Sequence, residues 1–185
     1  ADEDRRELFD MQADPGQQHN VADEYPRVME ELSGRYLDWY RDISDRFTEA
    51  VRISLGHPEG GAALLTAHDW HAPIAQVPWN QPHIQRDLPG NGYWTVEIER
   101  AGTYRFTLQT RPGEHAVRMQ AVRAGVRAGQ QEKFQDIEPE AAVTHLVLEL
   151  PAGPTRLQTW LEKADGSSRG AFYVTVEFVG PAAEE

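Results

Sequence analysis

The sequence predicts a mainly β protein: an antiparallel, jelly-roll-like β-sandwich preceded by a short strand and one long amphipathic α-helix. Two observations predict the sandwich. Short segments in which apolar and polar residues alternate follow one another through the second half of the chain, and turn residues separate them. A third observation predicts the helix, because apolar residues recur every three or four positions between Pro26 and Phe47.

A short apolar run near the start of the chain has the length of a β-strand; it contains Leu8, Phe9 and Met11. An Asp-Pro-Gly sequence follows at residues 14–16. This sequence is typical of a turn, because proline presets φ and glycine accepts positive φ. The stretch therefore predicts a strand that turns sharply toward the helix.

The helix is expected to bury one face. Pro26 suits the first helical turn, where its missing N–H costs nothing. Gly34 lies inside the helical pattern and should cost about 1 kcal/mol relative to alanine, so we expect another element to approach the helix closely there. The apolar positions that define the face are Val28, Leu32, Tyr36, Trp39, Tyr40, Ile43 and Phe47.

After Phe47 the hydrophobic period changes from that of a helix to that of a strand. Val51, Ile53 and Leu55 predict the first strand of the sandwich, and residues 57–61 break it. Residues 68–91 contain four prolines, so they predict an ordered, covering loop without a long regular element. We therefore expect two parts, residues 1–49 and residues 50–185.

Alternating segments continue from Tyr93 to the end of the chain. The segments at 94–98 and 104–108 are joined by a short turn at Ala101 and Gly102, which predicts a hairpin. With the first strand, these segments predict seven or eight strands. The remaining ones are expected at residues 117–121, 146–150, 157–161 and 172–178.

Composition excludes several classes of protein. The net charge of −12 disfavours nonspecific binding to nucleic acid or to an acidic membrane surface. The absence of cysteine excludes disulfides and thiolate metal sites. No window approaches the roughly 18 apolar residues of a membrane helix.

The chain neither begins with Met nor opens with a signal peptide, so we expect a fragment of a longer protein.

Residues 7–22 resemble a segment near the C-terminal end of the sulfatase (arylsulfatase) family. In that family a Glu-Leu-Tyr-Asp-Leu strand is followed by Asp-Pro-Gly-Glu, Asn-Leu-Ala and a helix. Here Phe9 stands for the Tyr, Met11 for the Leu, Gln17 for the Glu and Val21 for the later Leu. Residues 65–71, 78–81 and 156–160 resemble tail extensions carried by some bacterial sulfatases.

The resemblance implies that residues 1–49 end the C-terminal subdomain of a bacterial sulfatase and that residues 50–185 form an accessory β-sandwich. It also implies a periplasmic or secreted location. The expected role is to support the catalytic domain, shape substrate access or hold a homo-oligomer together. The expected partner is the missing N-terminal catalytic domain of the same protein.

The family's chemistry is absent from this chain. Sulfatases use a formylglycine made from Cys or Ser in a Cys/Ser-x-Pro-x-Arg motif, beside a divalent cation such as calcium. No serine here has that context, and neither a nucleophile elbow nor a phosphate-binding loop occurs. We therefore expect no catalysis and no cofactor in this fragment. The serines are Ser33, Ser44, Ser54, Ser167 and Ser168.

One short segment has the residue types of a metal site. His68, Asp69 and His71 provide two imidazoles and a carboxylate, which suit zinc or another transition metal. The alternative is that both histidines bond to backbone while Trp70 anchors the loop against the sandwich.

Aromatic residues suggest a second class of function, a stand-alone carbohydrate-binding module. Trp70, Trp79, Trp160 and Tyr173 could stack on sugar rings, and the strand phase suggests that Trp160 and Tyr173 share an outer face. The alternative is that both faces of the sheet are covered and that these aromatic residues are buried.

Arginines gather in a stretch where Glu114 is the only opposing charge. Guanidinium groups bind sulfate or carboxylate bidentately, so Arg118 and Arg123 are candidate ligands for a sulfated polysaccharide. The alternative is that these arginines are solvated residues of an outer face. The members of the stretch are Arg105, Arg111, Arg118, Arg123 and Arg127.

Overall fold

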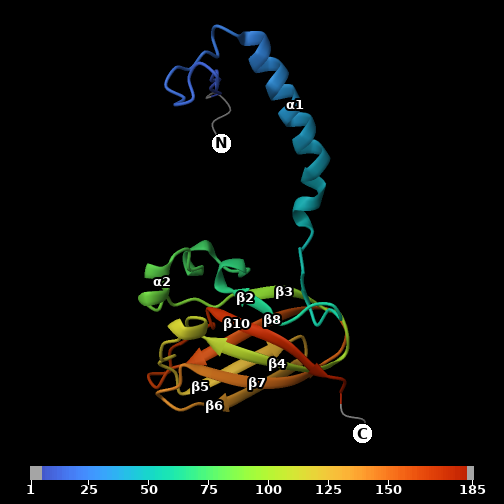
Figure 1. The fold of residues 1–185 in the computed structure, drawn as a ribbon, viewed down its shortest axis with the longest axis vertical. Coiled ribbons are helices and arrows are strands. Elements are labelled where there is room, and N and C mark those ends of the chain that lie inside the picture. Colours follow the sequence, from blue (N-terminus) through green and yellow to red (C-terminus); the bar gives the residue numbers. More distant parts are fainter. Residues whose placement is uncertain (1–5, 183–185) are drawn as a thin grey trace. The chain divides into compact units, whose positions relative to one another are not determined.

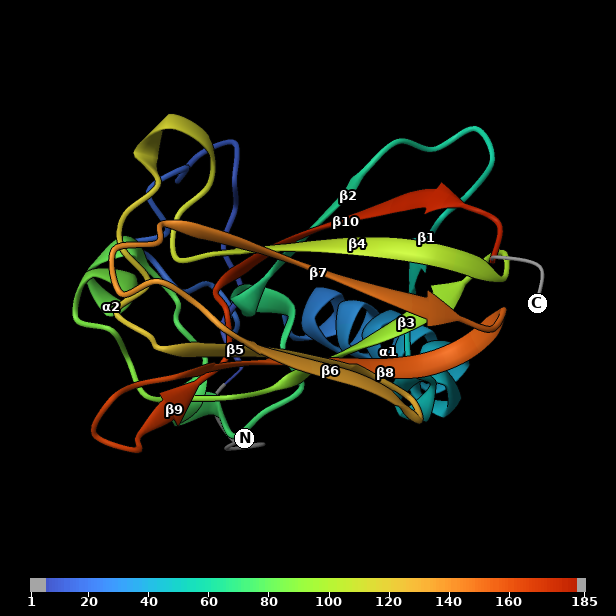
Figure 2. The same cartoon turned by 90° about the horizontal axis from the view of Figure 1, so that it is seen from below.

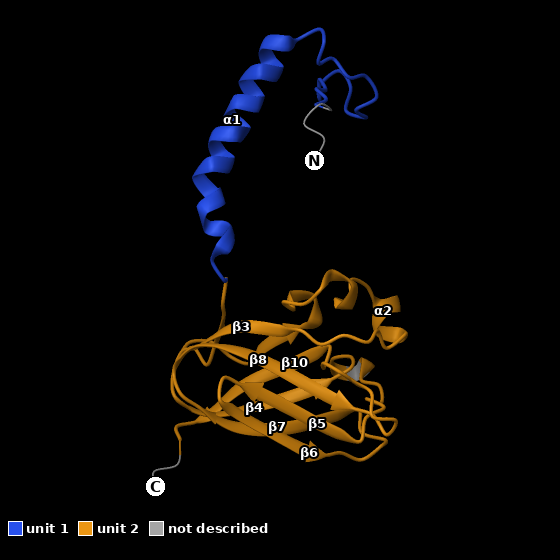
Figure 3. Ribbon diagram, turned by 180° about the vertical axis from the view of Figure 1, so that it is seen from behind, with its two compact units in different colours: residues 1–50 blue, residues 51–185 orange. Residues whose placement is uncertain are grey.

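The computed structural model describes residues 6–182, apart from the side chain of Glu114. The chain divides into two compact units, unit 1 with residues 1–50 and unit 2 with residues 51–185 (Figure 3).

Unit 1 contains the predicted helix. Helix α1 spans Pro26–Ser44, with Pro26 at its first turn, and continues into a short 3-10 helix, η1, at Asp45–Thr48. This confirms the helix that the periodicity predicts.

The strand predicted around Leu8 is wrong, because residues 6–14 form a loop. The side-chain oxygen of Asn20 accepts a hydrogen bond from the Leu8 N–H at 2.9 Å, and the Leu8 carbonyl accepts one from the Val21 N–H at 2.8 Å. A strand needs a partner with a free edge, and within the described part of unit 1 no other strand forms. The predicted turn at residues 14–16 is present, but Gln17 rather than Gly16 adopts the positive φ, at 53°.

The predicted burial of one helix face does not occur within unit 1. Helix α1 has no buried residue, and the large side chains of Tyr36, Trp39 and Phe47 are all more than half exposed. Gly34 is also open, since no atom of the described residues lies within 4 Å of the position that a Cβ atom would take. The described residues of unit 1 therefore provide no element that packs on this face.

Unit 2 is a sandwich of two sheets (Figures 1 and 2). The first sheet has the order β1 (Ile53–Leu55), β3 (Tyr93–Ile98), β8 (Gly153–Glu162), β5 (Arg123–Ala128) and β6 (Gln131–Asp136), with β9 (Ser168–Arg169) paired to β8. The second sheet has the order β2 (Ala63–Thr66), β10 (Tyr173–Gly180), β4 (Gly102–Gln109) and β7 (Val143–Leu150). All pairs are antiparallel except β1 with β3.

The core lies between the sheets and is filled by the apolar phase of each strand, as the alternation predicts. Trp94, Tyr104 and Phe106 are fully buried. The polar atoms among them are paired: the Trp94 indole N–H donates to the Thr66 carbonyl, and the Tyr104 hydroxyl donates to the Arg100 carbonyl, both at 2.7 Å. The predicted mainly β sandwich is therefore correct.

The predicted hairpin between β3 and β4 is wrong. β3 pairs with β8 in the first sheet, whereas β4 pairs with β10 and β7 in the second. The prediction failed because both strands bury every second residue. Two strands show this alternation both when they pair within one sheet and when they face each other across the core, so the alternation does not identify the partner. Most successive strands alternate between the sheets in the same way, which is the jelly-roll-like arrangement.

Other boundaries also differ from the prediction. Residues 117–121 form a loop rather than a strand, although Met119 and Ala121 are buried. Four strands were not predicted: β2, β5, the polar edge strand β6 and the short strand β9. The loop at 68–91 contains only short helices, as its prolines predict: η2 (Ala67–Asp69), η3 (Ile74–Gln76) and α2 (Gln81–Gln85), while η4 (Gly113–His115) follows β4.

Candidate functional site

The loop between β2 and β3 is held to the sandwich at both ends, and Trp70 forms the first anchor. Its ring is only 6% exposed and lies 5.8 Å from the ring of Trp94 and 6.2 Å from that of Phe172. Gly170 leaves room for the indole, since a Cβ atom there would lie 2.6 Å from it. Trp70 is therefore a core residue and not a ligand-binding one, which corrects that prediction and favours the alternative for this residue.

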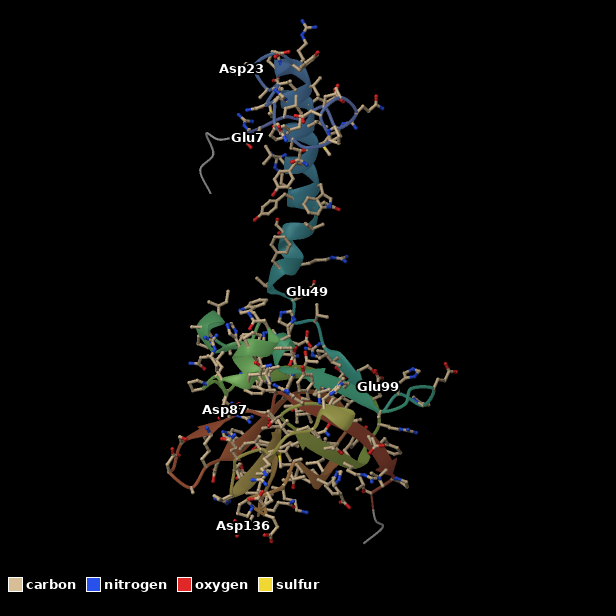
Figure 4. All side chains as sticks on the ribbon, turned by 60° about the vertical axis from the view of Figure 1, so that its left-hand side comes forward. Glu7, Asp23, Glu49, Asp87, Glu99 and Asp136 are labelled. Carbon is tan, nitrogen blue, oxygen red and sulfur yellow. The ribbon has the colours of Figure 1, made fainter. Side chains whose placement is uncertain are left out.

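The second anchor is an ionic cluster at Asp87, labelled in Figure 4. The carboxylate of Asp87 pairs with Arg169 through one oxygen and with Lys163 through the other. Arg169 is only 2% exposed, and it also donates to the Thr110 hydroxyl at 3.0 Å and to the Gly170 carbonyl at 2.9 Å. Burial lowers the pKa of Arg169, and the Asp87 carboxylate opposes this effect.

Between the two anchors the loop encloses a concave site that we call the Trp79 pocket, with a volume of about 240 Å³. The indole of Trp79 stands at this site and is 54% exposed. Tyr173, at the start of β10, contributes a half-buried phenol from the second sheet. The lining residues are Thr66, Ala67, His68, Pro78, Trp79, Asn80, Gln81, Ile84, Phe172 and Tyr173.

Local hydrogen bonds orient the polar side chains of the pocket. Asn80 caps α2, because its side-chain oxygen accepts from the His83 N–H at 3.0 Å, which leaves its amide nitrogen as a donor. The Gln81 amide nitrogen donates to the Tyr173 hydroxyl at 3.2 Å, which leaves the Gln81 carbonyl oxygen as an acceptor and the phenol as a donor. The site thus combines an open aromatic face with oriented polar groups.

The structure brings together only some of the predicted site residues. Trp79, Tyr173 and His68 line one pocket, although they come from three separate segments. Asn80 and Gln81 were not predicted. The sequence does contain a pattern that could have identified them. An asparagine two residues before Pro82 is typical of a helix N-terminus, and such a cap fixes the orientation of the Asn80 side chain.

Trp160 lies on the other sheet, so the predicted face shared with Tyr173 is wrong. Its ring contacts Phe134, with centroids 5.7 Å apart, and the guanidinium of Arg127, 5.2 Å from the ring centroid. Gly125 lies on β5, between Phe134 on β6 and Trp160 on β8. A Cβ atom at Gly125 would lie 2.2 Å from the Phe134 ring, so glycine is needed for this packing. Trp160 is therefore part of a packed outer surface, which favours the alternative that these rings are covered.

The predicted arginine ligands are also separated. Arg123 lies over the Phe134 ring at 4.8 Å and 3.5 Å from the Glu162 carboxylate. Arg118 pairs with Glu140 at 2.5 Å, outside the sheets.

The predicted metal site does not form. His68 packs edge-on against Trp79, and the Asp69 carboxylate accepts a hydrogen bond from the Thr66 hydroxyl at 2.9 Å. His71 stacks on Tyr93, with ring centroids 5.2 Å apart. Among the residues that the structure describes, no group of three or more His, Cys, Asp and Glu side chains could hold a metal ion.

No helix in the described part of the chain is both long enough and apolar enough to cross a membrane.

Comparisons with known proteins gave structural similarities only. No family model matches the chain, and no curated protein matches it. A ruminal GH26 endo-β-1,4-mannanase aligns at 14% identity over 70% of this chain with a TM-score of 0.42, and this chain spans 28% of that protein's length.

Two carbohydrate-binding modules also align. A family 35 module from an environmental isolate matches at 22% identity over 52% of this chain and 73% of its own, with a TM-score of 0.35. The module CBM6cm-2 of Cellvibrio mixtus lichenase 5A, solved with cellotriose, matches at 7% identity over 65% of this chain and 100% of its own, with a TM-score of 0.38. Because all these TM-scores are below 0.5, we base the functional argument on the residues of this chain.

Proposed function

We propose that unit 2 is a carbohydrate-binding β-sandwich and that one sugar ring binds in the Trp79 pocket. The observation that carries the proposal is the indole of Trp79, which is 54% exposed at a concave site instead of buried in the core. An exposed indole offers an apolar face on which the C–H face of a pyranose can pack.

The polar groups beside the indole suit sugar hydroxyls. The Asn80 amide nitrogen and the Tyr173 hydroxyl can donate, and the Gln81 carbonyl oxygen can accept. A small number of oriented polar groups around an apolar surface is typical of small-molecule sites. These groups would fix the orientation of the ring once it packs on Trp79.

The pocket favours an uncharged sugar. Among the described residues that line it there is no Asp, Glu, Lys or Arg. A sulfate or carboxylate group inside the pocket would lose its hydration without gaining an opposite charge. The ligand class that this lining supports is therefore a neutral sugar unit, which includes an unsubstituted unit of a sulfated polysaccharide.

Calorimetric titration of the full chain with neutral and sulfated oligosaccharides tests this proposal. We expect saturable binding of a neutral oligosaccharide and weaker binding when the ring that enters the pocket carries a sulfate. An absence of binding by every neutral and sulfated oligosaccharide at millimolar concentration would contradict it.

Unit 1 supports a second role, which we also propose: docking onto the catalytic domain of a sulfatase-like sulfuric ester hydrolase. The apolar face of α1 and η1, with Tyr36 and Trp39 on α1 and Phe47 on η1, is open within the described part of unit 1. Exposed apolar patches of this kind mark interaction sites. The resemblance of residues 7–22 to the sulfatase family suggests the identity of the partner.

The sequence of the full-length protein tests this second role, since it must contain a Cys/Ser-x-Pro-x-Arg motif. Trp39→Glu should also weaken a complex with the catalytic domain, whereas Trp160→Glu in unit 2 should not. A full-length chain without the motif would exclude a sulfatase. Self-association of the wild-type region that Trp39→Glu abolishes would assign the face to a homo-oligomer instead.

A further inference from the structure

A second cavity, which we call the arginine pocket, shares the lining residue Ile84 with the Trp79 pocket. It has a volume of about 230 Å³. Its charged lining residues are Asp87, Arg111, Arg118 and Arg169. We propose that the arginine pocket binds a small oxyanion, such as sulfate, phosphate or a carboxylate, either free or as a substituent of a larger molecule.

The charge of the lining supports an anionic ligand. Three arginines face one carboxylate, and that carboxylate, on Asp87, is already paired with Arg169 and Lys163. The whole chain carries a net charge of −12, so a cationic concave site is opposite in sign to the protein as a whole. Such a local field attracts small anions.

Arg111 provides the second observation. Its side-chain Nε atom is buried and has no hydrogen-bond partner among the residues that the structure describes. An unsatisfied buried donor is costly, and native structures seldom keep one unless an ion or water completes it. Guanidinium groups bind sulfate, phosphate and carboxylate oxygens through two parallel hydrogen bonds. The Arg111 side chain lines the pocket, so an oxyanion bound there would accept hydrogen bonds from its guanidinium group.

The roles of the other two arginines differ. Arg169 is 2% exposed, and four of its five N–H donors already bond to Asp87, Thr110 and the carbonyls of Met119 and Gly170, so it contributes charge and not a contact. The Arg118 side chain is 68% exposed, and its ion pair with Glu140 is open to solvent. An exposed pair of this kind is worth little, so Arg118 can exchange Glu140 for a ligand at the mouth of the pocket.

The test is thermal unfolding of the full chain in sodium sulfate or sodium phosphate against sodium chloride at equal ionic strength. We expect a saturable rise in Tm with either oxyanion. Arg111→Gln should weaken the apparent affinity about tenfold or more, because a hydrogen bond to a charged group is lost. Arg118→Gln should weaken it less, and this variant keeps the test valid if Arg111→Gln does not fold.

Arg105→Gln is the matched control, because Arg105 is half exposed and pairs with Glu177 on the outer face of the second sheet. Sulfate and phosphate also stabilise proteins by exclusion from their surfaces, and this effect is neither saturable nor dependent on one arginine. An equal, unsaturated rise in Tm for wild type, Arg111→Gln and Arg105→Gln would overturn the proposal.

Competition with an oligosaccharide distinguishes the two sources of the anion. Displacement of a sulfated oligosaccharide by inorganic sulfate would assign the site to a glycan substituent, and saturable binding of inorganic ions alone would assign it to a free anion. The proposal does not depend on the Trp79 pocket, since Trp79→Ala should leave the response to inorganic sulfate unchanged.

Discussion

The imidazole of His68 meets the indole of Trp79 edge-on, with ring centroids 4.8 Å apart and ring planes at 90°. His68 belongs to η2, and Trp79 immediately precedes the N-cap of α2, so this contact joins two arms of the loop. An edge contact of this kind restrains the indole, which would lower the entropy lost if a sugar binds as proposed.

His68 should therefore act on sugar affinity through Trp79. Replacing His68 with Ala removes the edge contact, which is worth about 0.5–1.5 kcal/mol, and should weaken binding by roughly two- to tenfold. His68→Phe keeps an aromatic edge and should bind nearly as well as the wild type in calorimetry. Equal losses in the Ala and Phe variants would instead indicate a direct contact between the imidazole and the sugar.

Trp79 itself should dominate sugar binding. Trp79→Ala removes the apolar surface and should reduce affinity at least tenfold, since truncating a central aromatic residue typically costs about 2 kcal/mol or more. The side chain is more than half exposed, so Tm should change little. Trp160→Ala is the control, because that indole lies on the opposite sheet. Comparable affinity losses in both variants would contradict the assignment of the pocket.

Asp87 should be essential for the stability of the loop. Asp87→Asn leaves the guanidinium of Arg169 buried without its counter-ion, and removing one partner of a buried pair costs about 3–5 kcal/mol. Chemical unfolding measures this loss. Asp136→Asn, at an exposed position on β6, should change the free energy of unfolding by less than about 0.5 kcal/mol. A small effect at Asp87 would mean that water satisfies Arg169.

Gly170 should tolerate no side chain. A Cβ atom would lie 2.6 Å from the Trp70 indole, so Gly170→Ala forces the anchor to move and should cost about 1–3 kcal/mol. Gly180→Ala is a suitable control, because within the described part of the chain no atom lies within 4 Å of its Cβ position. Thermal unfolding compares the two variants, and an unchanged Tm for Gly170→Ala would show that the packing around Trp70 is loose.

Tyr104 should make stability fall at alkaline pH. Burial raises the pKa of its hydroxyl above the ordinary value of 10.0, so the native state holds this proton after the unfolded state has lost it. The resulting stability is complete below about pH 10 and is lost as the pH rises through the folded-state pKa. Unfolding measured from pH 8 to pH 12 should show a decline that is smaller in Tyr104→Phe. Parallel curves for both proteins would refute this origin.

Some of the residues predicted to bind a metal or a sugar are separated in the structure, although they are close in sequence or share a strand phase. His68 and His71 are close in sequence, yet one packs on Trp79 and the other on Tyr93, because the 3-10 turn and the bridge to β3 direct them to different surroundings. Trp160 and Tyr173 share an alternation phase, but that phase points outward from two different sheets. Residue type and spacing identify candidate side chains without identifying their neighbours.

By itself the sequence determined the helix at Pro26–Ser44 and the buried faces of β3, β4, β7, β8 and β10, because hydrophobic period is a local property of the chain. Only the tertiary structure decided that β3 and β4 belong to different sheets and that Trp79 and Tyr173 line one pocket. These relationships depend on pairing between distant segments, such as Tyr173 with both Thr66 and Gln109, and no local pattern encodes which partner a strand edge will take.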